Sequence, residues 1–529
     1  MACTSPLAAA TPSVIIVDRR VLLPERPTPR RELFLPCLDI IWKDLHYNRR
    51  LLFYANCPPS AVHQLQLSLS KCLVHYYPWC GRIAEHVEPP HRLFLDCNDA
   101  GVEFVEASVD VPMHTLAEDG FQMKPFFDHL CQNPDPHGER LFSAPLLSIQ
   151  ATTFSDGGLA VGVAHSHVVA DGQSLWNFMV SWGECSRGMS PSIPPLHDRV
   201  QLAMYSLSQE ENSCWSFVMQ VKGEDDTGNP SVIQDQSGSV ISKSSTSARG
   251  DMQEVESPNG LLQSNIGVMA PKLIVDRRVS DVEVLNRSEI PDSSKLLVGE
   301  SATRSNELDL LVQFVFDLSA SDVRKLKADA GEGFTSYEVI CAHFWRTTTL
   351  ARQAPVQSKT SFSVLANCRN HLRPPLSAAY FGNVISFSFA LSTAGKVATD
   401  PLRVTAGYIH DLVLKLKNDI VSFMHHLETH GTSIVNDIRR ARKGIKGHNV
   451  ASSPRFSVYE VDFGWGKPRA VRSAKVAGEG ELVFFGGRPE ACPGDVEICT
   501  ALPLGIMEQL LKDPLFLPKP TSKRLQMQG

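Results

Sequence analysis

Several features that mark well-known protein classes are missing from this chain of 529 residues. No apolar run approaches the roughly 18 residues of a membrane helix. No GxGxxG and no GxxxxGKS or GxxxxGKT segment occurs, so neither dinucleotide binding nor nucleotide hydrolysis is indicated. A basic surplus is also missing: 51 Lys and Arg stand against 57 Asp and Glu, a net charge of -6. A nucleic-acid surface needs excess positive charge to displace counterions. We therefore expect neither nucleic acid nor a membrane as partner.

Paired cysteine motifs are missing as well. The 13 cysteines are odd in number and scattered, with no CxxC. This pattern favours neither a disulfide framework nor a zinc site, and fits thiols used as small core residues in a reducing compartment. The first 13 residues lack the basic start of a secretory signal, and the last ones match no retention address. We expect a cytoplasmic protein without a bound metal.

What the chain does have is the composition and alternation of a large globular protein. Hydrophobic residues make up 43% and charged residues 20%, and the length suits two or more domains. Apolar spacings of three and four predict helices over residues 62–76, with Ser60 as cap, and 175–182. The run at 159–164 predicts a buried strand.

The second half shows the same alternation. Ser319 and the pair Thr335 and Glu338 predict capped helix starts. Residues 400–425 predict one long helix and 456–461 a strand. Alternating elements in both halves indicate α/β or α+β layers.

Residues 206–305 interrupt the pattern. The stretch is rich in Ser, Gln, Asn, Gly and acidic residues and has little apolar periodicity, so it predicts a flexible linker, of which about 210–264 is expected to be dispensable for chemistry. It also repeats IVDRRV, found at 16–21 and again at 274–279. Six residues are too short for a repeat architecture, and we interpret the copy as chance or a duplication scar.

Two motifs carry chemical information. Residues 167–172 read HVVADG and follow the predicted buried strand, which is a usual place for a functional group on a rigid scaffold. Alone this motif is weak, because about one HxxxD is expected by chance in a chain with 18 His. Residues 462–466 read DFGWG. That string is expected by chance in roughly one chain in ten thousand of this length. Their conjunction is therefore specific.

The two motifs, in this order and at these relative positions, resemble those of the plant BAHD acyltransferases. The turn at 77–82, YPWCGR, is similar to the family's YPLAGR with two substitutions, and 373–385 resembles the RPPL and YFGNVI segments of hydroxycinnamoyl transferases. The resemblance covers nearly the whole chain outside the linker. It implies an α/β fold of two similar-sized domains, residues 1–205 and 306–529. These would resemble chloramphenicol acetyltransferase, with residues 206–305 as crossover loop and a channel between the domains.

The resemblance assigns roles to the first motif. His167 matches the family's general base, and an imidazole titrating near 6.5 suits proton transfer at cytosolic pH. A purely structural histidine is the alternative when the motif stands alone. By strand parity His165 lies on the same face as His167, as a wall residue or a substrate contact. Asp171 would pair with Arg369, the alternatives being a helix cap or another ion pair, and Gly172 would supply a tight turn.

Other assignments concern the wall and the coenzyme end. Asn383 lines the channel or belongs to a turn that enters a strand. The second motif, Asp462, Phe463, Gly464, Trp465 and Gly466, is expected to be structural, with Trp465 as a core anchor rather than an oxyanion donor. The basic run at 439–446 either meets coenzyme A phosphates or is a solvated loop.

The resemblance therefore implies a monomeric transferase that moves an acyl group, with hydroxycinnamoyl as the candidate, from acyl-CoA to a small alcohol or amine of plant specialised metabolism. No bound cofactor and no acyl-enzyme is expected. Two rivals stay open. One is a condensation-type transferase that takes its acyl group from a carrier protein; the other is a non-catalytic binding protein on the same scaffold.

Overall fold

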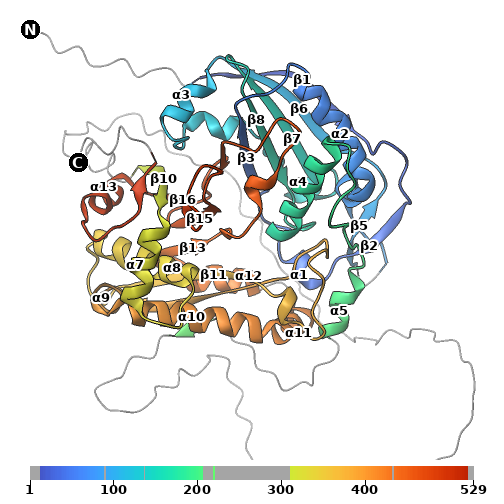
Figure 1. The fold of residues 1–529 in the computed structure, drawn as a ribbon. Coiled ribbons are helices and arrows are strands. Elements are labelled where there is room, and N and C mark those ends of the chain that lie inside the picture. Colours follow the sequence, from blue (N-terminus) through green and yellow to red (C-terminus); the bar gives the residue numbers. More distant parts are fainter. Residues whose placement is uncertain are drawn as a thin grey trace, which may run out of the picture. The chain divides into compact units, whose positions relative to one another are not determined.

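The computed structural model describes residues 12–88, 91–135, 137–206, 218–220, 310–431 and 434–521. Each half of the chain builds one large sheet with helices against it, so the protein has a mixed α/β fold with two domains (Figure 1). The predicted fold class is confirmed. Most of the predicted linker, including residues 221–305, lies outside the described residues.

The first sheet has six strands and contains the predicted buried run. Its order is β1 (Val14–Leu22), β6 (Val102–Val109), β7 (Leu147–Phe154), β8 (Leu159–His165), β3 (Asn48–Tyr54) and β14 (Ala470–Ser473). Every residue of β8 is buried. Because β8 has a partner on each side and both faces covered, it reads as a continuous apolar run rather than an alternating one.

Two helices cover one face of this sheet. They are α2 (Ala61–His75) and α4 (Gly172–Ser186), which pack against each other (Figure 1). Both were predicted by their apolar spacing and are confirmed. The predicted cap at Ser60 is wrong in one respect, because the Ser60 side chain makes no capping bond. Its backbone (φ -86°, ψ 5°) is not extended, the conformation in which a cap side chain reaches back to the helix.

The second sheet has eight strands. Its order is β17 (Lys519–Pro520), β10 (Leu311–Leu318), β16 (Val496–Pro503), β15 (Glu481–Gly486), β13 (Lys446–Val450), β11 (Lys359–Asn367), β12 (Ile385–Thr393) and β9 (Val218–Gln220). Three helices pack together beside it: α7 (Ala320–Ala330), α8 (Ser336–Ala351) and α10 (Leu402–Asn418). The caps predicted at Ser319 and Thr335 are confirmed, the latter as a complete capping box.

Two predicted elements of the second half are wrong. Residues 400–425 form two helices, α10 and α11 (Ile420–His430), which meet at Asp419 (φ -96°, ψ 11°). The apolar periodicity continues across the junction, and only the backbone at Asp419 breaks the helix. Residues 456–461 are a turn with a 3-10 segment, Val458–Glu460, instead of a strand. Their apolar side chains are buried by packing and not by sheet pairing.

The two sheets are linked by strand pairing across the chain and by a buried ion pair. Strand β14 of the second half pairs antiparallel with β3 in the first sheet. Its Arg472 forms a buried ion pair with Glu497 of β16 in the second sheet, at 3.0 Å. In turn β9, which lies inside the predicted linker, pairs parallel with β12. A deletion designed to test the linker should therefore begin after Val221.

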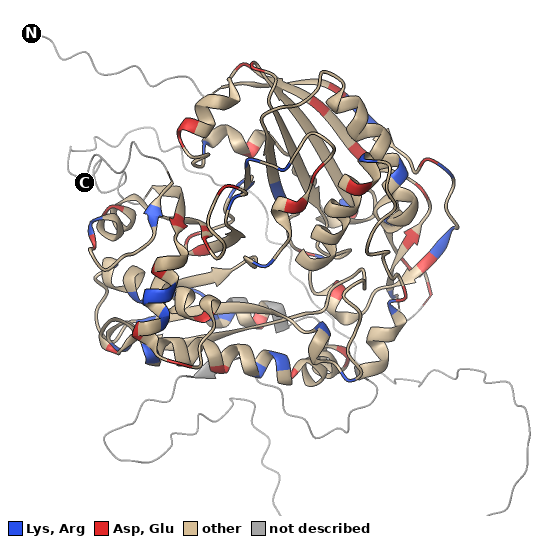
Figure 2. Ribbon diagram, in the orientation of Figure 1, with Lys and Arg blue, Asp and Glu red and all other residues tan. Residues whose placement is uncertain are grey.

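The remaining elements are short or peripheral. A small sheet contains β2 (Arg31–Phe34), β5 (Leu93–Cys97) and β4 (Arg82–Glu85). The other helices are α1 (Cys37–Ile40), α3 (Met113–Glu118), α5 (Val200–Ser206), α9 (Ala394–Thr399), α12 (Ile434–Arg442) and α13 (Leu504–Lys512). The described helices are too short or too polar to cross a membrane. Figure 2 shows acidic and basic residues interspersed over both halves of the described chain.

Candidate active site

The first motif lies in the turn between β8 and α4. Strand β8 ends at His165, and His167 follows two residues later with a partly exposed side chain. One face of its imidazole lies against Trp42, with ring centroids 4.5 Å apart and an interplanar angle of 29°. A buried strand thus places a single imidazole at the edge of the core, against an aromatic wall.

His165 lies deeper than His167. Its side chain is 2% exposed, and its ring is 6.2 Å from that of His167 and edge-on to Trp79 at 5.8 Å. Neither ring nitrogen of His165 has a hydrogen bond of normal geometry. Burial lowers its pKa well below the usual value, and the neighbouring His167 and Arg50 lower it further. His165 is therefore a neutral, buried residue in this structure.

The pKa of His167 is also lowered. Burial is the main cause; Arg50 adds to it, while the residue's own carbonyl oxygen, Asp171 and Asn383 act in the opposite direction. An imidazole whose pKa lies below 6.5 is mostly neutral at pH 7, and the neutral form is the one that accepts a proton.

Asp171 faces away from the imidazole and is bonded elsewhere. Its Oδ2 lies 2.7 Å from Nη1 of Arg369, and its Oδ1 3.1 Å from Nη2. Oδ1 also accepts from the backbone N–H of Ser174, which caps α4, and Oδ2 accepts from that of Val384. The cap and the ion pair, which the sequence left as alternatives, are thus both present. This pair joins the first motif to the second half of the chain.

Arg369 is equally well bound. Its Nη2 also donates to the hydroxyl of Ser174 at 3.0 Å and to the carbonyl of Gly382 at 3.1 Å. The side chain is 3% exposed, so the pair stands in a nearly dry environment. An intact pair there fixes the two chain segments relative to each other.

The predicted reason for a glycine at position 172, a tight turn, is wrong. Gly172 is the first residue of α4 and has no left-handed φ. A Cβ at this position would lie 2.6 Å from the ring of Phe456. Close packing of an aromatic ring from the second half is what requires glycine here.

A buried polar cluster under the site escaped the sequence analysis. Asp39 accepts from Arg199 Nη1 at 2.7 Å and from the Asn383 side chain at 2.7 Å and backbone at 2.9 Å. Arg199 also donates to the carbonyl of Val169, and Asn383 to the carbonyl of His167, at 2.7 and 2.8 Å. The cluster therefore fixes two backbone carbonyls of the first motif by hydrogen bonds. An acid alone in the apolar run of residues 35–42 was the signal for it, because buried carboxylates need partners.

Asn383 therefore belongs to this buried polar cluster and does not line a channel. It is fully buried, and its amide joins Asp39 to His167. Asn383→Ala is expected to destabilise the protein by about 1–3 kcal/mol, because a buried carboxylate loses a donor, and to lower turnover by about tenfold, because the carbonyl of His167 is released. Chemical denaturation and steady-state rates measure the two effects. An equal loss in exposed Asn370→Ala would contradict this role.

The second motif lies at the other end of α4. The carbonyl of Phe463 accepts from Ser186 at 2.7 Å and from Gln64 at 2.9 Å, and Arg187 donates to the carbonyl of Asp462. Helix α4 has 15 residues, so at 1.5 Å per residue the motif is about 22 Å from the start of the helix. Direct contact with the reacting groups at His167 is excluded by this distance.

Within the second motif the glycines serve a tight loop. Asp462 Oδ1 accepts from the backbone N–H groups of Gly464 and Gly466, whose φ values are +107° and +103°. Phe463 is fully buried against Trp182, with ring centroids 4.7 Å apart. Trp465 packs on Tyr54, at 6.3 Å. This arrangement is that of a structural anchor.

The basic run at 439–446 spans the end of α12, a turn and the start of β13. Arg440 pairs with Asp437, and Lys446 with Glu479. Arg442 lies over the ring of Phe389, 5.6 Å from its centroid. Lys443 is exposed. Most of these cations therefore already have partners within the fold.

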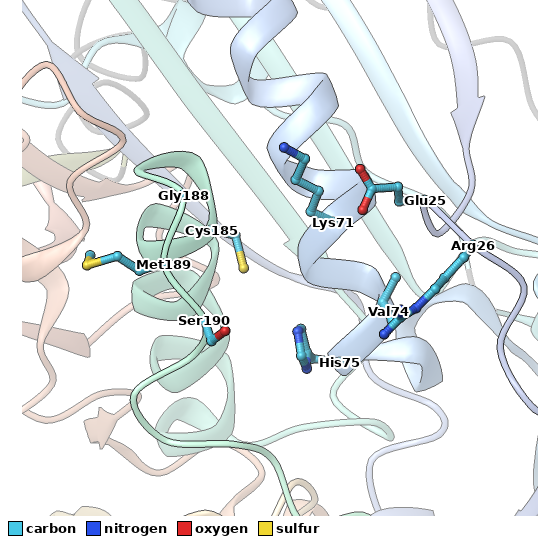
Figure 3. A pocket seen from close by; sticks show the side chains of 9 residues that line it. All are labelled: Glu25, Arg26, Lys71, Val74, His75, Cys185, Gly188, Met189 and Ser190. Carbon is cyan, nitrogen blue, oxygen red and sulfur yellow. The ribbon is translucent and has the colours of Figure 1, made fainter.

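A pocket of about 240 Å³ lies beside the ends of α2 and α4 (Figure 3). It is lined by the end of α2, the end of α4 with the loop that follows, and the segment after β1, through Glu25, Arg26, Lys71, Val74, His75, Cys185, Gly188, Met189 and Ser190. No residue of either motif lines it. Within the described ranges no group of three or more His, Cys, Asp or Glu side chains could hold a metal.

The Transferase family matches residues 12–257 and 279–517. BAHD acyltransferase DCR of Arabidopsis thaliana is 28% identical over 95% of this chain and 92% of its own length. Shikimate O-hydroxycinnamoyltransferase of Nicotiana tabacum is 25% identical over 88% and 91%.

Two solved structures share the fold. Vinorine synthase superposes with a TM-score of 0.61 at 19% identity, over 97% of this chain and all of its own. TRI101 of F. sporotrichioides, solved with coenzyme A and T-2, gives 0.64 at 15% identity, over 93% of this chain and all of its own. At these identities the likeness concerns the fold alone.

Proposed function

This chain belongs to the Transferase family as a BAHD acyltransferase, and we propose that it moves an acyl group from a coenzyme A thioester to the hydroxyl or amine of a small acceptor, with His167 as general base. One observation carries the proposal. The partly exposed imidazole of His167 follows a buried strand and has a lowered pKa, and the acid of its motif is bound to Arg369.

The reaction follows from that geometry. The acceptor O–H or N–H gives its proton to neutral His167 while the oxygen or nitrogen attacks the thioester carbonyl. The tetrahedral intermediate collapses, the C–S bond breaks, and the coenzyme A thiolate takes the proton back from the imidazolium. Proton and charge balance without a metal, a bound cofactor or an acyl-enzyme.

The donor is proposed to be a hydroxycinnamoyl-CoA. Support comes from the RPPL and YFGNVI segments and from the names of relatives, which include hydroxycinnamoyltransferases of Nicotiana tabacum and Oryza sativa. Coenzyme A as donor is supported by TRI101, which was solved with it.

Thiol release tests the proposal. The enzyme is incubated with a panel of acyl-CoAs, and separately with acyl-carrier proteins, together with shikimate, phenolic amines, polyamines or fatty alcohols. Acceptor-dependent release of coenzyme A is the expected result. Release from carrier protein alone would favour a condensation-type transferase. No release from any donor, by a folded protein, would favour a binding function.

The pH profile gives a further prediction. Activity requires neutral His167, so kcat/KM falls as pH drops through the pKa of that group. Because burial lowers this pKa below 6.5, the acid limb is expected below pH 6.5, and the rate should change little between pH 7 and 8. Initial rates in buffers of constant ionic strength measure the limb. A limb above pH 7 would contradict the environment described for His167.

A further inference from the structure

The structure lacks the orienting carboxylate that many histidine bases have. Both oxygens of Asp171 are bound to Arg369 and to backbone N–H groups. Those of Asp39 are bound to Arg199 and Asn383. Among the described residues no carboxylate is hydrogen-bonded to His167, and its buried Nδ1 has no hydrogen bond of normal geometry. Something else must hold the ring and stabilise its charged form.

Trp42 is the side chain placed to do so. Its indole is stacked on the imidazole at 4.5 Å and backed on the far side of the contact by Phe387, at 5.5 Å. It is 7% exposed. A stacked ring at this distance limits rotation of the imidazole, and its π face attracts a cation within about 6 Å.

The position of Trp42 is fixed by the cluster that holds His167. The backbone N–H of Trp42 donates to the carbonyl of Asp39 at 3.2 Å. The side chain of Asp39 binds Asn383, which donates to the carbonyl of His167. Asp39 therefore links the two residues, through its backbone carbonyl to Trp42 and through its carboxylate and Asn383 to His167.

The polar groups around the imidazole do not outweigh its burial. The residue's own carbonyl oxygen, Asp171 and Asn383 favour the cation, yet the pKa of His167 is lowered overall, by burial and by Arg50 on β3. Asp171 at the start of α4 also pairs with Arg369, and His165 on β8 is a neighbour with a lowered pKa of its own. The indole adds a π face in direct contact with the ring.

We propose that Trp42 is the positioning residue of the base: its indole orients the imidazole of His167 and stabilises the imidazolium that forms when the acceptor loses its proton. This inference rests on the proposed function of His167. It gives the indole the part that a hydrogen-bonded carboxylate has in a catalytic triad.

Two substitutions separate the effect of the π face of Trp42 from the effect of its apolar volume. Trp42→Met removes the π face but keeps an apolar side chain, and Trp42→Phe keeps a π face. Trp345→Met is the matched control, because Trp345 is a fully buried indole of α8 that packs against Phe362 at 5.6 Å, outside the site. Thermal unfolding of all three shows how much any buried indole contributes to stability.

The decisive measurement is the pKa of His167 itself. Histidine labelled with ¹³C at Cε1 is titrated by NMR without substrate, and the His167 signal is identified by its loss in His167→Gln. Trp42→Met is expected to lower the pKa by about half to one unit, the size of a partly desolvated cation–π contact, and to lower kcat about tenfold. Trp42→Phe should restore most of both. Trp345→Met should change neither.

The direction in which the pKa of His167 changes in Trp42→Met decides between two explanations. An indole that acted only by excluding water would lower the pKa of His167, so its removal would raise it. An unchanged or raised pKa in a folded Trp42→Met protein overturns the proposal. If Trp42→Met does not fold, fluorinated tryptophan incorporated into the wild-type chain weakens the π face and should lower the pKa in the same direction. Because the titration needs no turnover, it remains readable if the acyl transfer reaction itself proves wrong.

Discussion

His167→Ala is expected to reduce acyl transfer by about 100-fold to 10,000-fold while the fold stays intact, which is the range for loss of a general base. The imidazole is partly exposed and forms few bonds to the rest of the protein, so its removal costs little stability. Release of coenzyme A at saturating acceptor measures the loss. Thermal unfolding, measured in parallel, verifies the fold.

His165→Ala is the matched control for that result. It removes the same group from the same strand end, 6.2 Å from His167, but the His165 side chain is only 2% exposed, so an acceptor does not reach it. Its effect on rate should be much smaller, with a larger effect on stability because a cavity forms in the core. A greater loss of turnover in His165→Ala, at equal folding, would transfer the role of base to His165.

Asp171→Ala is expected to destabilise the protein by about 3–5 kcal/mol, because it leaves the Arg369 charge buried without a partner. Loss of the cap of α4 adds about 1 kcal/mol. Arg369→Ala should cost a similar amount for the converse reason. The double variant should lose less than the sum of the two, since neither buried charge then remains. Denaturant unfolding of the four proteins gives the coupling energy.

An exposed pair provides the control for that cycle. Arg440 and Asp437 form an ion pair in which the Arg440 side chain is 76% exposed, so Arg440→Ala should change stability by less than about 1 kcal/mol. Additive effects of Asp171→Ala and Arg369→Ala would refute a structural pairing.

The buried pair also has a pH signature. Burial opposes ionisation of Asp171, but Arg369 and the backbone N–H groups of Ser174 and Val384 hold its pKa below the usual value. The stabilisation is therefore complete above the unfolded pKa of about 3.9. It is lost as pH falls through the lower, folded value.

The helices and strands that a local pattern of residues indicates could be predicted from the sequence. Helix α2 follows from apolar residues three and four apart, β8 from an unbroken apolar run, and the start of α8 from a capping box. The two motifs were equally local, so the candidate base at His167 needed no structure. The partner of Asp171 was found through a family resemblance, because nothing in the spacing of residues 171 and 369 points to a contact.

The other features became visible only in the tertiary structure. The physical reason is that contacts between segments distant in the sequence produce no periodic pattern of residues. Asp39, Arg199 and Asn383 meet from three parts of the chain, and Trp42 contacts His167 although the two are far apart in the sequence. The break at Asp419 and the loss of a strand at 456–461 were likewise hidden, because burial by packing and burial by pairing select the same apolar residues. Gly172 is glycine because Phe456 arrives from another domain, and no local rule contains that ring.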